Sequence, residues 1–448
     1  MNKKFQIIAT SLAIGLMSTP AYSQNGVNSP YSRYGFGMQG DRSLGFNKGM
    51  SGVSQGFRSG QEINVMNPAS YSAVDSLTAL IDFGMTFQNG NYKMDGIQKN
   101  ARNTSIDYFA FQFRAFKNIG MSLGILPYTN INYNFSSSAE NLSGSDDIPS
   151  SYTFSGSGGL NQVYFGAAWR AFGGPLSIGF NASYLYGDYS HTSTISYNNT
   201  SAYSNVRGYS ADISTWKLDA GLQYTLRLSK SDDLTLGATY SLGHEVKNRA
   251  IRNTQTLSGT TVQGMTSDTI RNAFELPHSL DAGFTFRHGN RWRLGGDFTL
   301  EKWSECKFPS QGGSEGLFVS KKGQLYDRMR VALGYDITPN AMSKKFLNRL
   351  TYKLGGYYSR SYACADLTGT VTDKPFEYGV SAGFSIPISN RNLWYNSPKI
   401  NVAFHWVHSD IPYLNTTTMR KSNLVENYLK LSLGLTFSER WFYKWKVQ

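Results

Sequence analysis

Residues 429–437 read Leu-Lys-Leu-Ser-Leu-Gly-Leu-Thr-Phe, so that apolar and polar side chains alternate strictly. Residues 81–88, Ile-Asp-Phe-Gly-Met-Thr-Phe-Gln, show the same pattern near the other end of the chain. Successive side chains of a strand point to opposite faces, so each stretch has one apolar and one polar face. About a dozen or more such segments occur in the chain, which is typical of barrel strands between lipid and a polar lumen.

The first 23 residues have the features of a secretory signal peptide. Lys3 and Lys4 precede an apolar run over residues 5–17, and small residues at 21–23 precede Gln24. The apolar run is too short to span a bilayer as a helix. No later stretch of 18 apolar residues occurs, which excludes a helical membrane protein. We therefore expect the outer membrane of a Gram-negative bacterium, with both termini periplasmic.

Composition agrees with this location. Of the 448 residues 14% are aromatic and 45 are Gly, which suits interfacial girdles and tilted, closely packed strands. The net charge of +13 fits solvated loops and contact with anionic head groups, and nucleic acid is an implausible partner. The expected partners are outer-membrane lipid, lipopolysaccharide and, during insertion, the barrel-assembly machinery. A soluble β-sandwich array is the alternative, but its loops would not alternate between long and short.

The alternation predicts an all-β fold, a transmembrane antiparallel barrel of about 14 strands over residues 77–437. One set of strands is expected at 77–89, 120–135, 176–190, 234–247, 291–304, 349–361 and 399–409, and the opposite set at 104–116, 152–170, 206–228, 276–288, 326–338, 376–388 and 425–437. Long connections such as 248–275 are assigned to the outside and short ones such as 117–119 to the periplasm.

Residues 24–76 do not alternate. They are rich in Gly, Ser and Asn and contain Pro30 and Pro68, and they are long enough to fold into the lumen as a plug. The predicted organisation is a signal peptide at 1–23, the plug at 24–76, the barrel at 77–437 and a periplasmic or interfacial tail at 438–448.

Several motifs together resemble the FadL/TodX family of channels for hydrophobic compounds, in the branch common in Bacteroidetes. The first matching motif is Asn67-Pro68-Ala69, which follows the Gly-rich stretch Gly45 to Gly60, and the second is Gly158-Gly159-Leu160. The third is Leu276-Pro277, which continues to Gly283 and is followed by Trp292, Leu294, Asp297 and Trp303. The last is Asn423 to Tyr428, running on to Trp441-Phe442. The resemblance implies a barrel with 14 strands, and a plug in which Asn67, Pro68 and Ala69 form the plug motif. It also implies passive uptake without an energy source or catalysis.

The resemblance further implies a kink in the third strand that opens a lateral exit. Gly124 and Pro127 lie in that strand, and Pro cannot donate to the ladder while Gly weakens it. We expect a gap near these residues, lined by apolar side chains such as Leu126 and Ile131. An ordinary bulge or strand end is the alternative.

The last strand carries a candidate assembly signal. Leu435 and Phe437 supply the terminal apolar and aromatic residues that barrel-assembly machinery reads, although Ser432 stands where Gly is usual. Residues 441–446, Trp-Phe-Tyr-Lys-Trp-Lys, look interfacial because aromatic residues and Lys gather at head-group depth.

No motif predicts catalysis, a metal or a cofactor. Residues 35–40 match G-x-G-x-x-G but lack the flanking strand and helix of a dinucleotide site, so tight backbone packing is preferred. Residues 52–56 match G-x-S-x-G without a strand-to-helix turn or an evident His partner, which disfavours a hydrolase. His405 and His408 are three residues apart on a strand and therefore point to opposite faces.

The two cysteines, Cys306 and Cys364, fall near the bases of neighbouring outer loops. They could form a disulfide in an oxidising space or remain two thiols, because their Cα separation cannot be read from sequence.

Two functions remain open at this point. A passive channel for a hydrophobic small molecule predicts an apolar lumen pocket and a discontinuous wall. A non-transporting subunit of an outer-membrane secretion or barrel-assembly complex, with outer-membrane or lipoprotein partners, predicts a sealed barrel and exposed apolar loop patches.

Overall fold

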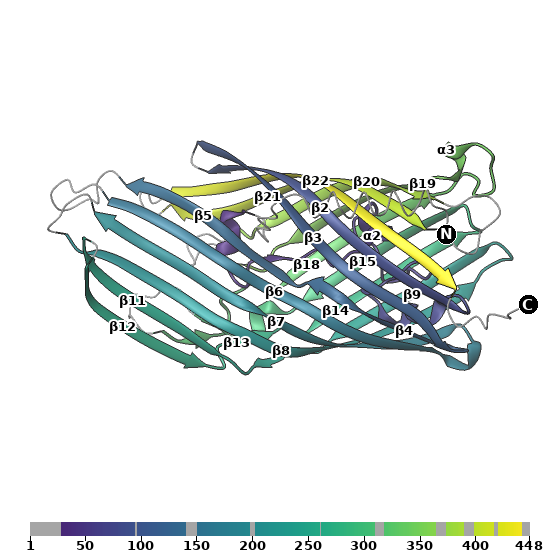
Figure 1. The fold of residues 1–448 in the computed structure, drawn as a ribbon, viewed down its shortest axis with the longest axis horizontal. Helices are drawn as coiled ribbons and strands as arrows, with labels where there is room; N and C mark the ends of the chain where they lie inside the picture. Colours follow the sequence, from purple (N-terminus) through teal and green to yellow (C-terminus); the bar gives the residue numbers. More distant parts are fainter. Residues whose placement is uncertain are drawn as a thin grey trace, which may run out of the picture.

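The computed structural model is a closed antiparallel β-barrel (Figure 1). It describes residues 28–94, 96–139, 150–197, 202–259, 261–309, 318–363, 373–388, 398–415 and 420–440. Eighteen strands pair in one sheet. Of these, β1 (Met38–Gln39), β11 (Arg249–Ser258) and β12 (Thr261–Arg271) are not part of the wall, and β4 and β5 share one wall position. Fourteen wall positions remain, which confirms the predicted class and strand number.

The wall strands follow one another in chain order. They are β2 (Thr78–Met94), β3 (Ile97–Phe116), β4 (Ile119–Pro127) with β5 (Thr129–Ala139), β6 (Ser150–Arg170), β7 (Leu176–Tyr197), β8 (Ser204–Arg227), β9 (Asp232–Ser241), β14 (Ser279–His288), β15 (Trp292–Glu301), β18 (Arg328–Ile337), β19 (Thr351–Arg360), β20 (Phe376–Pro387), β21 (Lys399–Asn415) and β22 (Arg420–Arg440). Pairing of β2 with β22, from Thr78 opposite Arg440 to Lys93 opposite Val425, closes the barrel.

The remaining elements are short. They are η1 (Pro30–Arg33), α2 (Gly45–Lys48), η2 (Pro68–Ala73), η3 (Ala171–Gly173), η4 (Trp303–Glu305), α3 (Phe346–Arg349), and the paired strands β10 (His244–Val246) with β13 (Phe274–Leu276) and β16 (Phe308–Pro309) with β17 (Ser320–Lys321). In the part of the chain that the structure describes, no helix is both long and apolar enough to cross a membrane.

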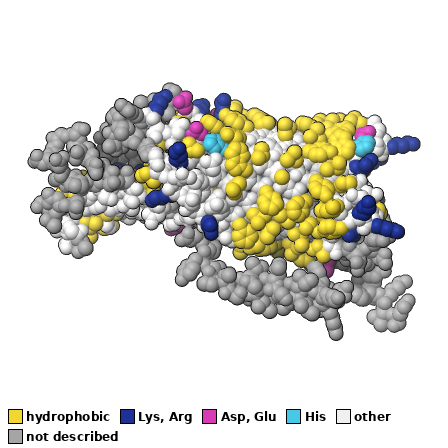
Figure 2. Space-filling model, turned by 90° about the horizontal axis from the view of Figure 1, so that it is seen from above, with side chains coloured by type: hydrophobic (Ala, Val, Ile, Leu, Met, Phe, Trp, Pro, Cys, Tyr) yellow, Lys and Arg dark blue, Asp and Glu magenta, His cyan; other side chains and the backbone are white. Residues whose placement is uncertain are grey.

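The alternation sorts side chains between the two faces of the wall as expected. In β22 the side chains of Leu431, Leu433 and Leu435 are partly exposed, whereas the neighbouring Ser432 and Thr436 are buried on the lumen side. Figure 2 shows the outward apolar side chains gathered in a band across the middle of the visible face, with Lys and Arg near its ends. An apolar belt between charged rims is the surface that a bilayer requires.

The region 248–275, expected as an outer loop, contains the long hairpin β11–β12. Its strands pair with each other, and β11 also pairs with the end of β8, so this hairpin extends the sheet beyond the barrel (Figure 1). The side chains of β12 are almost all exposed. The hairpin was missed because apolar and polar residues do not alternate in its sequence.

Residues 28–76, here called the N-terminal segment, lie against the inward-facing side chains of the wall. The backbone of Phe46 accepts a hydrogen bond from Lys353 of β19 at 2.5 Å, and the Tyr71 hydroxyl donates to Asn181 of β7 at 2.9 Å. Leu44, Phe57 and other buried apolar side chains of the segment form one cluster with the wall. The predicted signal peptide lies outside the described residues, as does the predicted tail apart from 438–440, which continue β22.

Candidate functional site

The third wall position is interrupted. Strand β4 pairs with β3 up to Ile125 opposite Phe109, and with β6 up to Pro127 opposite Asn161. Beyond Tyr128, β5 pairs with β6, and residues 97–108 of β3 pair with β2. Within the described ranges no pairing joins β3 to β5. Two strand edges therefore face each other in the half of the barrel that carries the long loops.

The interruption begins slightly later than the sequence suggests. Gly124 is paired on both sides, with Ala110 and Tyr164. A Cβ atom there would lie 2.2 Å from the Phe109 carbonyl oxygen, so this Gly serves close strand packing. Leu126 and Ile131 are each 1% exposed and belong to two interior apolar clusters.

The N-terminal segment supplies the hydrogen bonds that β3 does not. Strand β1 pairs with β5, Met38 opposite Asn130 and Gln39 opposite Thr129. The Gly40 N–H donates to the Tyr128 carbonyl at 2.9 Å. The kinked backbone is thus satisfied from inside the barrel, as buried peptide groups must be.

Two glycines of the stretch 35–40 make this approach feasible. Gly37 has a φ of +87°, and a Cβ atom there would lie 2.4 Å from the Asn130 carbonyl oxygen. At Gly40 it would lie 2.9 Å from the Pro127 carbonyl oxygen. The stretch therefore packs backbone against backbone, in the manner expected for the G-x-G-x-x-G match.

Strand β6 accommodates the break from the other side. Gly158 and Gly159 have φ values of +121° and +129°, a region that favours glycine. A Cβ atom on Gly159 would lie 2.4 Å from the Thr129 carbonyl oxygen. A Gly-Gly pair inside a strand is a recognisable sign of a bulge or close approach, so this part of the site could have been inferred from sequence.

A cavity of about 790 Å³ lies beside the interruption. One wall is the edge of β3, with Asn103, Ser105 and Asp107, and another is the third strand from Pro127. The remaining lining comes from the N-terminal segment and inward-facing side chains of the wall. Most of its side chains are polar or charged: the ionisable members are Asp41, Arg42, Lys48, Asp107, Asp188, Asp281, Arg328, Arg330, Tyr357, Glu377, His405 and Lys430.

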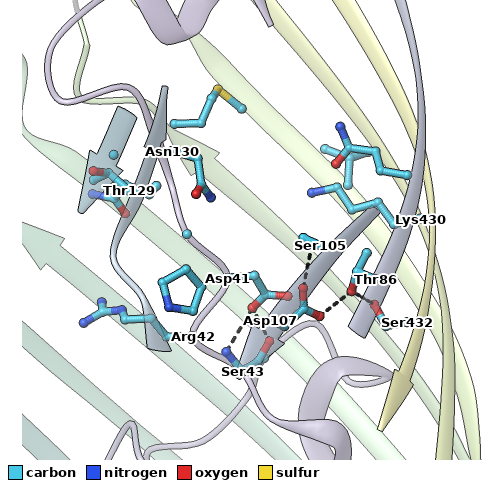
Figure 3. Close-up of a pocket in the computed structure, with 18 of the residues that line it drawn as sticks. Asp41, Arg42, Ser43, Thr86, Ser105, Asp107, Thr129, Asn130, Lys430 and Ser432 are labelled. Atoms are coloured by element: carbon cyan, nitrogen blue, oxygen red, sulfur yellow. Dashed lines mark hydrogen bonds between the residues drawn. The ribbon is translucent and has the colours of Figure 1, made fainter. Parts of the chain in front are cut away.

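A buried ion pair joins the N-terminal segment to the edge of β3. The Lys48 ammonium lies 2.6 Å from Asp107 and 3.3 Å from Asp41. Thr86 and Ser105 donate hydroxyl hydrogen bonds to the Asp107 carboxylate (Figure 3). Burial would lower the pKa of Lys48, but Asp107 and Asp41 outweigh it and raise the pKa above its usual value. Lys48 is therefore charged at neutral pH.

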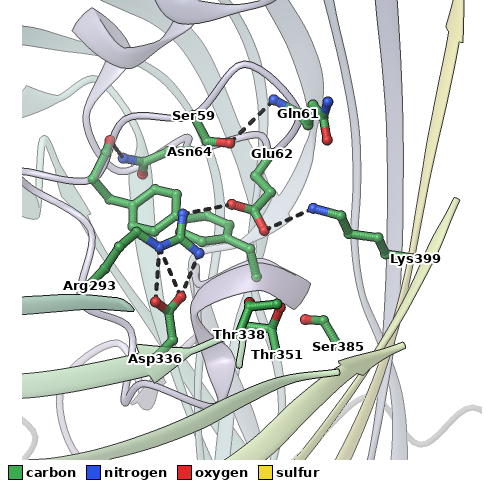
Figure 4. Close-up of polar contacts among 12 residues, drawn as sticks. Ser59, Gln61, Glu62, Asn64, Arg293, Asp336, Thr338, Thr351, Ser385 and Lys399 are labelled. Atoms are coloured by element: carbon green, nitrogen blue, oxygen red, sulfur yellow. Dashed lines mark hydrogen bonds and ion pairs between the residues drawn. The ribbon is translucent and has the colours of Figure 1, made fainter. Parts of the chain in front are cut away.

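Two more contacts hold the segment along the barrel axis. Asp297 of β15 accepts hydrogen bonds from the backbone N–H groups of Ser54, at 2.6 Å, and of Gln55. Near the other end, Glu62 lies 3.1 Å from Arg293 and 3.5 Å from Lys399, and Arg293 also binds Asp336 (Figure 4). Burial alone would raise the pKa of Glu62, but Lys399 and then Arg293 hold it well below its usual range.

The predicted Asn67-Pro68-Ala69 motif lies at the start of η2. The Asn67 side chain accepts from the Ala69 N–H at 3.1 Å and donates to the carbonyls of Gln55 and Leu222. Gly221 of β8 leaves room for it, because a Cβ atom there would lie 2.4 Å from the Asn67 oxygen.

The other sequence candidates lie apart from the cavity, with one exception. Leu435 and Phe437 are outward residues of β22, opposite Phe83 and Ile81 of β2. Cys306 is buried, and the proposed disulfide lies outside the described residues because Cys364 does. His405 lines the cavity, whereas His408 packs against Tyr378 on the opposite face.

The arrangement does not suggest catalysis. The Ser54 hydroxyl of the G-x-S-x-G match donates to Asp297 at 3.2 Å, which makes it a structural contact. Among the described residues no group of three or more His, Cys, Asp or Glu side chains is placed to hold a metal ion. What the site offers is a polar, charged chamber next to unpaired strand edges.

Sequence reasoning did not single out Lys48 and Asp107. A signal was present, because Lys48 and Arg58 are the only charged residues between Gly45 and Gly60. A charge in such a stretch needs a partner once it is buried. Its partner could not be named, since the pairing depends on the folded position of the segment.

Comparisons with known proteins place the fold and the family. Similar solved structures include a FadL homologue from Pseudomonas aeruginosa (TM-score 0.63, 12% identity, covering 90% of this chain and 99% of that one) and the toluene transporter TodX from Pseudomonas putida (0.58, 15%, 91% and 100%). The monoaromatic hydrocarbon channel CymD is similar as well (0.54, 13%, 90% and 98%). At these identities the likeness concerns the fold. No curated protein matches.

The family model BamG matches residues 1–448, the whole length of the sequence. The chain therefore belongs to the BamG family, and it has the fold of the FadL and TodX outer-membrane barrels.

Proposed function

We propose that this chain is a non-transporting barrel subunit of an outer-membrane barrel-assembly complex. The observation that carries the proposal is the chemistry of the cavity beside the interrupted wall. The cavity has a charged lining, in which Lys48 and Asp107 are paired. An apolar ligand would displace water from these charged groups and offer them no hydrogen bonds in return, which is energetically unfavourable. A route for hydrophobic compounds would instead be lined by apolar side chains.

Family membership supports the same proposal. The matching family model is named BamG, and we interpret the prefix of that name as referring to barrel assembly. The N-terminal segment supports it too: held by Asp107, Asp297 and Arg293, it would act as a fixed plug rather than a moving one. We infer outer-membrane location after removal of residues 1–23, with the short turns and both termini in the periplasm. Membership of the branch common in Bacteroidetes remains a prediction, based on the motif at residues 423–428.

The β11–β12 hairpin is our candidate for contact with a partner subunit. Val262 and Met265 of β12 are 52% and 58% exposed, and β12 is an edge strand that pairs with β11 on one side. Exposed edges of this kind can pair with another chain. Such an edge presents extended backbone with few charges, and β12 carries only Asp268 and Arg271.

Affinity purification of the full chain from its own membranes in mild detergent tests the proposal. We expect barrel-assembly subunits to copurify, and to be lost when residues 249–271 are replaced by a short Gly-Ser turn. The control variant replaces residues 93–98, at the tip of the β2–β3 hairpin, in the same way, because β2 and β3 pair with each other there and not with β11 or β12. If the chain purifies alone and the hairpin variant leaves cell growth and barrel assembly unchanged, the proposal is wrong.

The second candidate is passive uptake of hydrophobic small molecules through a lateral opening. The missing pairing between β3 and β5 favours it, because it leaves a break in the wall near Pro127. Uptake of a radiolabelled monoaromatic compound into liposomes containing the purified protein tests it. Uptake above that of protein-free liposomes, abolished by a disulfide engineered across the two edges, would favour the channel over the complex subunit.

A further inference from the structure

A second cavity opens among the short turns of the barrel. Its volume is about 1340 Å³, larger than the roughly 300–1,000 Å³ of pockets for small molecules. Nine basic and four acidic side chains line it, an excess of five positive charges. We call it the basic basin.

Five arginines of the basic basin have no ion pair among the residues that the structure describes: Arg58, Arg114, Arg170, Arg291 and Arg349. They come from the N-terminal segment, the ends of β3 and β6, the turn before β15 and α3. Three of the four acidic side chains, Glu62, Asp233 and Asp336, already pair with other basic residues. The fourth, Asp75, forms no ion pair with a described residue, so it can offset at most one of the five charges.

Neutral groups hold three of these arginines in place. Arg58 donates to Ser72 at 3.0 Å, Arg114 to the Val74 carbonyl at 2.9 Å, and Arg170 to the Gly174 carbonyl at 2.8 Å. Such contacts fix the guanidinium groups without cancelling their charge. Burial, and to a smaller extent the charge of Arg170, lower the pKa of Arg58 to about 10, so Arg58 still carries its charge at neutral pH.

We infer that the basic basin binds an acidic, extended peptide segment of a periplasmic partner protein. The unpaired charges are spread over several turns, so a single small anion would neutralise few of them, whereas an extended chain presents successive carboxylates about 3.3 Å per residue apart. Arg guanidinium groups bind carboxylates strongly and with defined geometry. A lipid head group would have to leave the bilayer, because the basin is enclosed by the wall residues Thr225, Thr235 and Thr285.

This inference deepens the proposed function, because it names the chemistry of one partner. It rests on the assignment of the short turns to the periplasm. It fails separately from that proposal, since copurification tests the complex and peptide binding by the isolated protein tests the basin.

The probe is a fluorescein-labelled peptide of about ten residues in which Glu alternates with Gly, measured by fluorescence anisotropy on the full chain in detergent. We expect saturable binding that weakens with added salt. The double variant Arg291→Gln/Arg349→Gln should bind about fivefold or more weakly, because two contacts between opposite charges are removed. The control Arg249→Gln/Arg271→Gln removes equal charge from the β11–β12 hairpin and should bind like the unchanged protein.

Three results would overturn the inference. The first is equal weakening in both double variants, which would indicate attraction to net charge alone. The second is equal binding of a peptide with Gln in place of Glu. The third is displacement of the acidic peptide by phosphatidylglycerol vesicles at lower concentration than by unlabelled peptide. Retained heat-modifiable migration of each variant shows that it is folded.

Discussion

Replacing Lys48 by Met tests whether the buried ion pair holds the N-terminal segment against the edge of β3. In the folded protein the Lys48 and Asp107 side chains are 4% and 9% exposed, and the pair is 2.6 Å long. The variant leaves a buried carboxylate without its counter-ion. Removing one partner of a buried pair costs about 3–5 kcal/mol. We expect the lower end, about 3 kcal/mol, because Asp107 keeps hydrogen bonds from Thr86 and Ser105.

Replacing Asp107 by Asn should have a smaller effect. Lys48 then keeps Asp41 at 3.3 Å, and the half-exposed Asp41 carboxylate can compensate its charge. We expect about 1–2 kcal/mol, the range of a hydrogen bond to a charged group. Because both changes act on one contact, the double variant should be less destabilised than the two single effects would give together.

Hydrogen exchange measured by mass spectrometry on the full chain reports the local opening. The N–H groups of Lys48, Met50 and Gly52 are hydrogen-bonded within the segment, so their exchange requires it to move. A loss of about 3 kcal/mol corresponds to exchange faster by roughly 150-fold. Lys302→Met is the matched control, because its pair with Asp327 is 3.0 Å long but partly exposed and should contribute at most about 1 kcal/mol. The reasoning is refuted if the exchange rate over residues 44–53 rises no more in Lys48→Met than in this control. It is also refuted if that rate rises more in Asp107→Asn than in Lys48→Met.

Three further predictions follow from the same structure. Gly37→Ala should strain the left-handed backbone and the β1–β5 contact by about 1–3 kcal/mol, seen as faster exchange at Tyr128, whereas Gly96→Ala, with φ +81° and no atom within 4 Å, should show the backbone strain alone. The double variant Leu435→Asp/Phe437→Asp should place charge on the lipid face of β22, at a cost of about 2 kcal/mol or less for each residue. It should lower the amount of heat-modifiable protein in the outer membrane, whereas the control Thr436→Ser on the lumen face should not. The ion pairs of Glu62 should stabilise the fold above pH about 4.3, and this stabilisation should be lost as the pH falls through the lowered pKa of Glu62. The thermal unfolding midpoint of the unchanged protein should therefore fall more steeply with acid than that of the Glu62→Gln variant.

The strands could be predicted because lipid imposes a period of two on one face. The range 176–190 was expected for β7, and the strand runs over Leu176–Tyr197. The excess beyond residue 190, like the β11–β12 hairpin, extends past the apolar belt, where no such pattern is imposed. The predicted end of β7 was therefore wrong in the part of the strand that lies beyond the apolar belt.

The interruption of the wall was predictable to within a few residues because its cause is local. Pro127 lacks an N–H group, and a strand needs that donor. The chemistry of the cavity was not predictable, because it depends on where the N-terminal segment sits. Lys48 and Asp107 belong to different elements, and no pattern in either stretch encodes their contact. Of the two apolar side chains expected at the gap, Ile131 lines the cavity and Leu126 packs in an interior apolar cluster, while most of the other lining residues are polar or charged.

The closure between β2 and β22 has a consequence for the timing of folding. These strands stand at opposite ends of the barrel sequence, so the seam between them can form only after the last strand has been made. The N-terminal segment is joined directly to β2 and pairs with β5 from within. The simplest route therefore brings the segment to the half-formed sheet while the seam is still open, and the final strand then encloses it. A chain held at that stage would display both the segment and two open seam edges to the cell's folding factors.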